Sequence, residues 1–273
     1  MKRFEGKTAV VTGAASGIGR STAELLARRG CRVAICDVNT EGLEETRQRI
    51  ESARGTVTAH EVDVADKARM AAFADEVKAD HGNVHIVVNN AGVSVVGNFA
   101  DLSLEDMEWI VGINFWGVVY GSKFFLPHLI EAGEGHIVNL SSVFGFIGLP
   151  TQSAYAATKF AVRGFSESLR AELGGRNIGV TSVHPGPIKT NIVAGGRFNH
   201  HAGDWLRQRT LDWFDQNAIS PDEAAKLILR GIRNNAARVL ITPHAYGIDW
   251  SKRIVPGLSD RIAAIVSRKQ GIT

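Results

Sequence analysis

The sequence has little of what marks several special classes of protein. Two cysteines in 273 residues are too few for a scaffold held by disulfides. No apolar run reaches the ~18 residues of a membrane span, and charged side chains interrupt the first ten residues, so no signal peptide is expected. Cys31 and Cys36 are expected on opposite faces of one strand, out of disulfide reach. These absences favour a protein of the reducing cytoplasm.

An excess of charge of one sign is also missing. The chain has 31 Lys and Arg against 28 Asp and Glu, and its basic residues are scattered. Because a nucleic-acid backbone is bound by a continuous basic surface, no nucleic-acid partner is expected. His81 and His85 could suggest a metal pair, but no third ligand with suitable spacing follows them, and no metal site is predicted.

What the chain does have is a regular alternation of apolar, strand-length runs with segments of helical period. Several runs are apolar throughout, as in parallel strands covered on both faces. This predicts an α/β fold, a doubly wound parallel sheet of about seven strands with helices on both faces (the Rossmann fold), in one domain over residues 1–273. The expected strands are residues 7–12, 31–36, 56–61, 84–89, 135–140, 178–183 and 238–242. The expected helices lie near residues 17–29, 41–53, 66–80, 103–130, 153–173 and 221–234.

Residues 190–219 and 244–273 depart from this alternation. The first segment is long for a connection and rich in aromatic residues, so we expect a lid over a substrate site, although aromatics that anchor the loop to the core would give the same pattern. The second predicts a C-terminal helical extension divided at Pro256 and Gly257. Its basic amphipathic part, residues 259–270, could touch a membrane surface. Packing on the domain or on a partner subunit is the preferred interpretation.

A glycine-rich turn follows the first expected strand and opens a helix. In TGAASGIG, residues 12–19, the three glycines Gly13, Gly17 and Gly19 would let the backbone approach a pyrophosphate bound at the N–H groups of the helix. A glycine-rich turn without a ligand is the alternative for this motif alone.

An acidic residue ends the second expected strand. Asp37 lies 18 residues after Gly19, near the ~20-residue offset at which a carboxylate binds an adenosine ribose. A carboxylate there repels the 2′-phosphate of NADP, and neither Ser16 nor Val38 supplies a cation, so we expect NAD. An aspartate that merely caps the next helix is the alternative.

Two further turns follow strands at the same expected edge of the sheet. Asp63 and Val64 follow the third strand, and NNAG, residues 89–92, ends the fourth. Ligands of open α/β sheets bind at this edge, and the small side chains of Ala91 and Gly92 would let the chain lie against a flat ring or ribose.

A tyrosine and a lysine one helical turn apart follow the fifth expected strand. Tyr155 comes 13 residues after Ser142, and Lys159 is four residues further on. Residues at i and i+4 share a helix face, so the ammonium can lie beside the phenol. Lowering a phenol pKa from ~10 to neutrality requires ~4 kcal/mol, which a partly desolvated ammonium and a cationic nicotinamide could provide. A simple surface pair is the alternative.

Together these motifs resemble the short-chain dehydrogenase/reductase family over about residues 5–190. TGAASGIG, Asp63-Val64, NNAG, Asn114 in GINFWG, Ser142, YAATK at 155–159 and PGPIKT at 185–190 occur in the family's order and spacing. Unlike many members, the chain has an extra helical tail after its last strand, which puts the family's usual tetramer contact in doubt. A homodimer or a homotetramer is expected.

The resemblance implies a catalytic tetrad. Tyr155 would be the general acid/base, Ser142 would bind the substrate oxygen, Lys159 would lower the pKa of Tyr155 and bind the nicotinamide ribose, and Asn114 would position a water that feeds protons to Lys159. Tyr155 and Lys159 would also touch the cofactor. The other expected cofactor residues are Gly13, Ser16, Gly17, Ile18, Gly19, Asp37, Asp63, Val64, Asn90, Ala91, Gly92, Pro185, Gly186, Ile188 and Thr190.

The expected activity is NAD-dependent interconversion of an apolar secondary alcohol and a ketone. The predicted substrate pocket is mostly apolar, and no Arg is present in it to bind an anion. Its residues are Ser94, Val95, Ser142, Val143, Phe144, Tyr155, Pro187, Ile192, Trp205 and Trp213. The rival hypotheses are an NADP-dependent carbonyl reductase and a non-catalytic NAD-binding sensor or scaffold.

Overall fold

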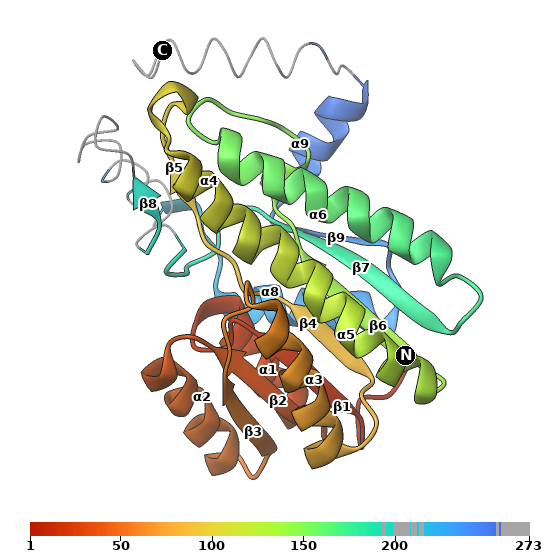
Figure 1. The fold of residues 1–273 in the computed structure, drawn as a ribbon. Helices are drawn as coiled ribbons and strands as arrows, with labels where there is room; N and C mark the ends of the chain where they lie inside the picture. The colour runs from red at the N-terminus through yellow and green to blue at the C-terminus, as the bar shows by residue number, and fades with distance from the viewer. Residues whose placement is uncertain (193–194, 199–207, 209–211, 213–215, 255–256, 258–273) are drawn as a thin grey trace.

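The fold is built on a parallel sheet of seven strands (Figure 1). A computed structural model describes residues 1–192, 195–198, 208, 212, 216–254 and 257. The strand order is β3-β2-β1-β4-β6-β7-β9, with every neighbouring pair parallel. The predicted α/β fold is confirmed. The strands are β1 (Thr8–Thr12), β2 (Arg32–Asp37), β3 (Thr56–Glu61), β4 (Ile86–Asn89), β6 (Gly135–Leu140), β7 (Ile178–Pro185) and β9 (Arg238–Ile241).

Burial along the strands follows their place in the sheet. Every residue of β1, β4, β6 and β7 is buried, because these inner strands are covered on both faces. β3, at the edge of the sheet, alternates between half-buried and exposed residues along most of its length. The runs that are apolar throughout in the sequence are therefore the middle of the sheet.

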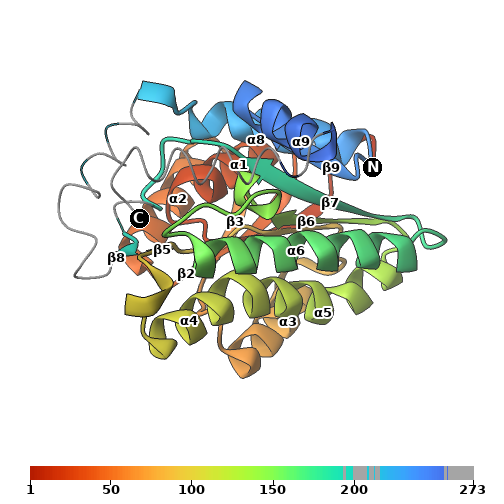
Figure 2. The same cartoon turned by 90° about the horizontal axis from the view of Figure 1, so that it is seen from above.

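Helices cover both faces of the sheet, as Figure 2 shows from above. α1 packs on α2 and α8 on one face, and α3 packs on α5 on the other, next to α6. Each face has its own hydrophobic cluster, one containing Cys31 and the other Cys36, which confirms that these two free cysteines face opposite ways. The helices are α1 (Gly17–Arg28), α2 (Thr40–Ser52), α3 (Lys67–His81), α4 (Leu104–Val111), α5 (Gly117–Glu131), α6 (Ser153–Glu172), α8 (Pro221–Arg233) and α9 (Pro243–Ile254).

The one long helix expected over residues 103–130 has a different internal geometry. α4 and α5 are joined by a π-helical turn, Gly112–Trp116, which contains Asn114. A π-helical turn widens the helix by one residue and turns the side chains there out of the regular α-helical repeat. Sequence periodicity does not reveal such a turn, because it inserts only one residue.

A second, two-stranded sheet was not predicted. β5 (Val95–Val96) pairs with β8 (Arg197–Phe198), so the start of the 190–219 segment is fixed beside the loop that follows β4. Arg197 strengthens this contact, since its guanidinium bonds Asp106 at 2.6 Å and lies 3.8 Å from the ring centroid of Trp109. Most of residues 199–215 lies outside the described residues.

The expected C-terminal extension begins with α9, and most of the remainder lies outside the described residues. Asp249 attaches α9 to the sheet, because its carboxylate accepts a hydrogen bond from Arg238 of β9 at 3.0 Å. Within the described part of the chain, no helix combines the length and apolar character needed to cross a membrane.

Candidate active site

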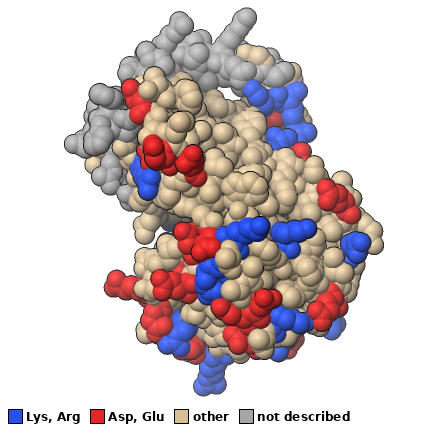
Figure 3. All heavy atoms as spheres, in the orientation of Figure 1, with Lys and Arg blue, Asp and Glu red and all other residues tan. Residues whose placement is uncertain are grey.

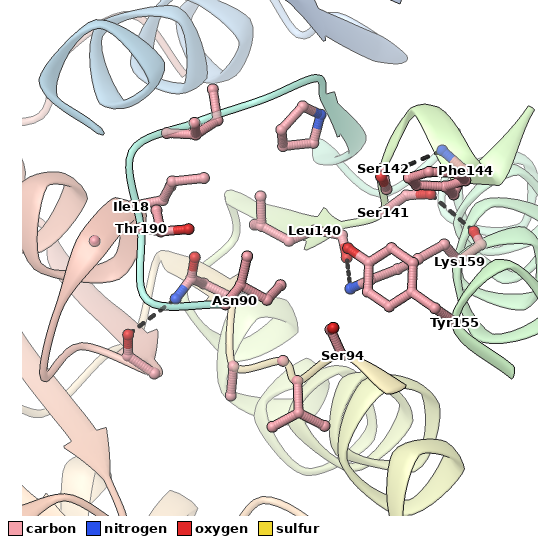
Figure 4. Close-up of a pocket in the computed structure, with 18 of the residues that line it drawn as sticks. Ile18, Asn90, Ser94, Leu140, Ser141, Ser142, Phe144, Tyr155, Lys159 and Thr190 are labelled. Carbon is pink, nitrogen blue, oxygen red and sulfur yellow. Dashed lines mark hydrogen bonds between the residues drawn. The ribbon is translucent and has the colours of Figure 1, made fainter. Parts of the chain in front are cut away.

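A cavity of about 840 Å³ lies at the carboxyl ends of the strands. The turns after β1, β2, β3 and β4 line one part of it, and the loops after β6 and β7, with α6 and α9, line the rest. Figure 4 shows Ile18, Asn90 and Thr190 on one side and Ser142, Tyr155 and Lys159 on the other. The topology thus brings residues as far apart in the sequence as Gly13 and Ile248 to one cavity.

The glycine-rich turn leaves backbone exposed at the amino end of α1. Gly13 has φ +66°, and a methyl group there would come within 2.7 Å of the Ala91 Cα, so only glycine fits. Ser16, the N-cap of α1, makes no side-chain capping bond in the described structure, and no acidic residue occurs in the first turn. The backbone N–H groups in the first turn of α1 therefore have no side-chain partner among the described residues and can bind phosphate oxygens.

Gly19 has a different role from the one expected. It is not among the described residues that line the cavity. A methyl group on Gly19 would overlap the Gly13 carbonyl oxygen and the Asn90 side chain. Gly19 is thus required for close packing of α1 against the β1 turn. It does not line the cavity itself, but it keeps Gly13 and Asn90, which do, in position.

Asp37 stands at the rim of the cavity in a fixed orientation. One carboxylate oxygen accepts a hydrogen bond from the Ala15 N–H at 2.9 Å, and the other accepts from the Asn39 N–H at 3.0 Å. Asn39, not Asp37, caps α2, so the alternative explanation of Asp37 as a helix cap does not apply. Val38 lines the cavity beside Asp37.

Asn90 ties the β1 and β4 turns together. Its side-chain N–H donates to the Thr12 and Gly13 carbonyls at 2.9 and 3.0 Å, and the Thr12 hydroxyl accepts from the Asn90 and Ala91 N–H groups, each at 3.0 Å. This cross-link fixes the floor on which Ala91 and Gly92 face the cavity. The other expected cofactor residues that line it are Ser16, Gly17, Ile18, Asp63, Val64, Pro185, Gly186, Ile188 and Thr190.

Tyr155 and Lys159 project from the first turns of α6 into the cavity (Figure 4). The Lys159 ammonium lies 5.5 Å from the centroid of the Tyr155 ring and donates to the Leu140 carbonyl at 2.9 Å. Burial lowers the pKa of Lys159 to about 8. Burial raises the pKa of Tyr155 to about 12, and a hydrogen bond with Ser142 opposes that shift.

Ser142 begins the short turn that follows β6. Its hydroxyl oxygen accepts a hydrogen bond from the Phe144 N–H at 3.2 Å and caps the 3₁₀ turn Val143–Gly145. Because the oxygen is the acceptor in that bond, the hydroxyl hydrogen can be donated to the Tyr155 oxygen, with which Ser142 is hydrogen-bonded, or to a substrate oxygen. Ser142, Tyr155 and Lys159 are thus neighbours in one wall.

Asn114 lies behind this wall and is fully buried. Its amide bonds the Val93 main chain twice, at 2.8 and 2.9 Å, and donates to Thr158 at 3.2 Å. A methyl group on Gly92 would come within 3.3 Å of the Asn114 Oδ1 and 3.4 Å of the Lys159 Nζ. The two polar atoms therefore border the same small space.

The expected substrate residues divide into three groups. Ser94, Val143, Phe144, Pro187 and Ile192 line the cavity. Val95 does not, and this prediction is corrected: successive residues of β5 face opposite ways, and Val95 packs with Ile110 and Ala154 in a hydrophobic cluster behind the wall. Trp205 and Trp213 lie outside the described residues.

Several lining residues were missed. Ile147, Leu149 and Gln152 come from the interval between Ser142 and Tyr155, and the need to cross the cavity between those two residues could have indicated them. Ile248 comes from α9 and lies 89 positions beyond Lys159, so nothing in the local sequence marks it.

Known proteins match the chain over nearly its whole length. The family model described as short chain dehydrogenase matches residues 7–199. The Mycobacterium tuberculosis protein named "Putative oxidoreductase SadH" is 44% identical over 269 residues, which cover 97% of this chain and 96% of that protein.

Solved structures agree with the family model. A short-chain dehydrogenase/reductase from Burkholderia phymatum in complex with NAD has a TM-score of 0.87 at 28% identity, over 95% of this chain and 97% of that one. A metagenomic short-chain oxidoreductase in complex with NADP has a TM-score of 0.72 at 28% identity, over 88% of this chain and 98% of that one. The glycine turn, the cross-linked floor and the matched motifs thus have one explanation: this chain belongs to the short-chain dehydrogenase family of oxidoreductases.

Proposed function

We propose that the protein interconverts an apolar secondary alcohol and the corresponding ketone with NAD(H), with Tyr155 exchanging the proton of the substrate oxygen. The observation that supports this is the meeting of Ser142, Tyr155 and Lys159 in one wall of the cavity. A phenol, a hydroxyl and an ammonium at one place supply an acid/base, an oxyanion donor and a cation to tune the acid/base.

Tyr155 would be protonated in the structure as it stands, because burial raises its pKa to about 12. In this form it can donate a proton to a ketone oxygen. Alcohol oxidation requires the phenolate, which the Lys159 ammonium, 5.5 Å from the centroid of the Tyr155 ring, would stabilise. Since burial lowers the pKa of Lys159 only to about 8, that side chain keeps most of its charge at neutral pH.

Ser142 would hold the substrate oxygen against Tyr155. Its oxygen accepts from the Phe144 N–H, so its hydroxyl hydrogen is the one to be donated: to the Tyr155 oxygen in this structure, and to the substrate oxygen once substrate is bound. A donor fixed in this way stabilises negative charge that develops on the substrate oxygen. Lys159 would return a proton to Tyr155, and Asn114, which borders the same space beside Gly92, would position a water that feeds protons to Lys159.

We infer NAD as the cofactor, held by the α1 turn, Asp37, the cross-linked β4 turn and residues 185–190. When bound, NAD supplies the hydride acceptor and a positive ring charge. Asp37 supports NAD over NADP, because its carboxylate is fixed at the rim and would repel a 2′-phosphate, while the neighbouring Ser16 and Val38 are neutral. The ratio of kcat/KM with NAD to that with NADP tests this; a strong NADP preference would remove Asp37 from this role.

The substrate wall supports an apolar substrate. The cavity lining includes Phe144, Ile147, Leu149, Ile192 and Ile248, and among the described lining residues the charged ones are Asp37, Asp63 and Lys159. None of these is an arginine that would bind a phosphate or carboxylate. We place the reaction in the cytoplasm, a reducing compartment consistent with two free, buried cysteines.

Tyr155→Phe tests the enzymatic role against a non-catalytic sensor or scaffold. Apolar secondary alcohols would be assayed with NAD by absorbance of the reduced cofactor, and NAD binding by calorimetry. We expect the variant to bind NAD within about twofold of wild type and to lose kcat by at least about 10³-fold, since the group that transfers the proton is gone. Tyr246→Phe, at an exposed tyrosine of α9, is the control and should change neither quantity. Undiminished turnover in Tyr155→Phe would end the assignment.

We also propose that the protein is a homo-oligomer. The aromatic side chains Trp116 and Phe160 are 45% and 42% exposed, and Trp116 stacks on Tyr120. The surface over α6 is largely uncharged in Figure 3, whereas charges of both signs mix over α2 and α3. An exposed apolar face of this kind is typical of a subunit interface. Light scattering of wild type and Trp116→Lys would separate a dimer or tetramer from a monomer.

A further inference from the structure

A buried histidine reaches the main chain of Ser142 from the neighbouring strand. His184 lies near the end of β7 and is fully buried. Its Nδ1 is 3.0 Å from the Ser142 carbonyl oxygen, and its Nε2 is 2.9 Å from the Ser182 hydroxyl. None of the motifs in the sequence indicated this residue.

These partners fix the protonation pattern of the ring. A carbonyl oxygen can only accept, so the Nδ1 of His184 carries the hydrogen and donates it to Ser142. The neutral ring then has Nε2 as an acceptor, which the Ser182 hydroxyl satisfies. Burial lowers the pKa of His184 to about 4, so this neutral form persists at physiological pH.

The histidine ring also packs against the end of the turn that begins at Ser142. It stacks on Phe146, with ring centroids 4.2 Å apart and planes 29° from parallel. The Arg163 guanidinium, from α6, lies over the Phe146 ring, 4.8 Å from its centroid. The turn that begins at Ser142 is therefore held between β7 and the helix that supplies Tyr155 and Lys159.

The Ser142 carbonyl oxygen accepts two hydrogen bonds with different consequences. The Gly145 N–H donates at 2.9 Å from within the same turn, so this bond fixes the internal shape of the turn. The bond from His184 joins the turn to the sheet. Ser141, one residue earlier, is also fixed, because its N–H donates to the Val183 carbonyl at 2.8 Å and its hydroxyl to the Lys159 carbonyl at 2.8 Å. Of the two bonds to the Ser142 carbonyl, only the one from His184 holds Ser142 itself relative to the sheet.

We propose that His184 is a positioning residue: its Nδ1–H bond to the Ser142 carbonyl holds the Ser142 hydroxyl at the substrate oxygen. This rests on the proposed alcohol–ketone activity. His184 itself is not among the described residues that line the cavity and acts through Ser142.

Two substitutions of His184 separate this bond from simple packing. His184→Asn keeps an amide N–H near the position of Nδ1, whereas His184→Gln places its amide near Nε2 and leaves the Ser142 carbonyl without that donor. We expect kcat of the Asn variant within about threefold of wild type. We expect kcat of the Gln variant to be about tenfold lower, the effect of one hydrogen bond, with the Kd for NAD unchanged within about twofold.

His136→Gln is the matched control. His136 is a second buried histidine, on β6, and its ring bonds Thr181 at 2.7 Å. Replacing it disturbs the core without touching the Ser142 turn, so kcat should stay within about twofold of wild type. A loss of kcat as large as that of His184→Gln would assign both effects to general core damage and overturn the proposal.

Two further measurements complete the test. Because the hydrogen bond with Ser142 lowers the pKa of Tyr155, the kinetic pKa assigned to Tyr155 should rise in His184→Gln and not in His184→Asn. Hydrogen exchange of residues 142–146, followed by mass spectrometry, should be faster in the Gln variant alone.

The failures of the two proposals can be told apart. A wild-type protein that binds NAD but oxidises none of the alcohols would refute the proposed function, and the exchange measurement would still decide whether His184 holds the turn. Equal kcat, kinetic pKa and exchange in the Asn and Gln variants would overturn the role of His184.

Discussion

At the scale of single residues, Lys159 shows a conflict between function and stability. Lys159 is 3% exposed, and its ammonium donates a hydrogen bond to the Leu140 carbonyl. Burial lowers its pKa from 10.5 to about 8, so the folded protein holds the charged form at a cost of about 3 kcal/mol at neutral pH. This cost is expected for a lysine whose function is to place a positive charge beside Tyr155.

Lys159→Met should therefore remove activity without a matching loss of stability. At pH 7 we expect a free energy of unfolding within about 1 kcal/mol of wild type, because the lost hydrogen bond offsets the relief of desolvation. Between pH 8 and 10.5 the unfolded wild type binds the Lys159 proton more than the folded form does, so wild-type stability rises with pH there. Urea unfolding should show wild type gaining about 2 kcal/mol over the variant from pH 7 to 9.5.

Lys123→Met, at an exposed lysine of α5, is the control for this measurement. Its stability relative to wild type should not change over the same pH interval. A Lys159→Met protein whose difference from wild type is independent of pH would contradict the depressed pKa of Lys159.

At the scale of elements, the contact between α1 and the β1 turn depends on the absence of a side chain. Gly19→Ala would push a methyl group into the Gly13 carbonyl and the Asn90 side chain, and both belong to the cross-linked floor. We expect a loss of about 2–4 kcal/mol in the free energy of unfolding and at least about tenfold weaker NAD binding. Thermal unfolding and calorimetry would measure the two effects.

Gly164→Ala is the matched control for that substitution. Gly164 is an exposed residue inside α6, and no described atom lies within 4 Å of the position of an added methyl group. Because alanine favours a helix over glycine, the variant should gain up to about 1 kcal/mol and bind NAD normally. Similar losses in both variants would show that the close contact at Gly19 is not the cause.

The elements themselves were largely readable from the sequence, and the exceptions have physical reasons. β1 and β4 are mostly valine, isoleucine and alanine (TAVVT and IVVN) and are buried throughout, so their pattern and their burial agree. β5 and β8 are two residues each and pair across about a hundred positions, so no local pattern indicates them. Val95 was assigned to the cavity because its neighbours belong there, whereas strand alternation turns its side chain the other way.

At the scale of the whole molecule, buried histidines couple folding to pH. Burial lowers the pKa of His136 to about 3 and that of His184 to about 4, from 6.5. Below pH 6.5 these two histidines bind protons in the unfolded chain but not in the folded chain. The free energy of unfolding therefore falls as the pH falls toward 4. Each of these histidines contributes about 2 kcal/mol of that loss between pH 6.5 and 5.

The contribution of His136 can be isolated. Urea unfolding of wild type and His136→Gln at pH 6.5 and 5 should show a drop that is about 2 kcal/mol smaller in the variant, whatever its stability at pH 7. Parallel pH dependences of the two proteins would show that His136 is not held neutral in the folded state.

The candidate site was readable from the sequence where a motif is local, and not where distant segments meet. The glycine turn, Asp37 and the Tyr155–Lys159 pair each have a fixed spacing along one or two elements, and the cavity includes them. Ile248 and His184 reach the site by tertiary packing alone. Their roles follow only from which side chains the sheet brings beside Ser142 and Tyr155.

The cavity is divided along the chain, and this division has an evolutionary consequence. The turns expected to hold the adenosine half of the nucleotide all precede residue 93, whereas the loops beside Tyr155 that face a substrate come mostly from residue 142 onward. Insertions or exchanges in the later loops can alter the substrate that the protein binds, while the earlier turns that hold the adenosine stay unchanged. Recombination of gene halves at the end of β4 should therefore yield hybrid proteins whose substrate differs from that of the parent while the nucleotide cofactor stays the same.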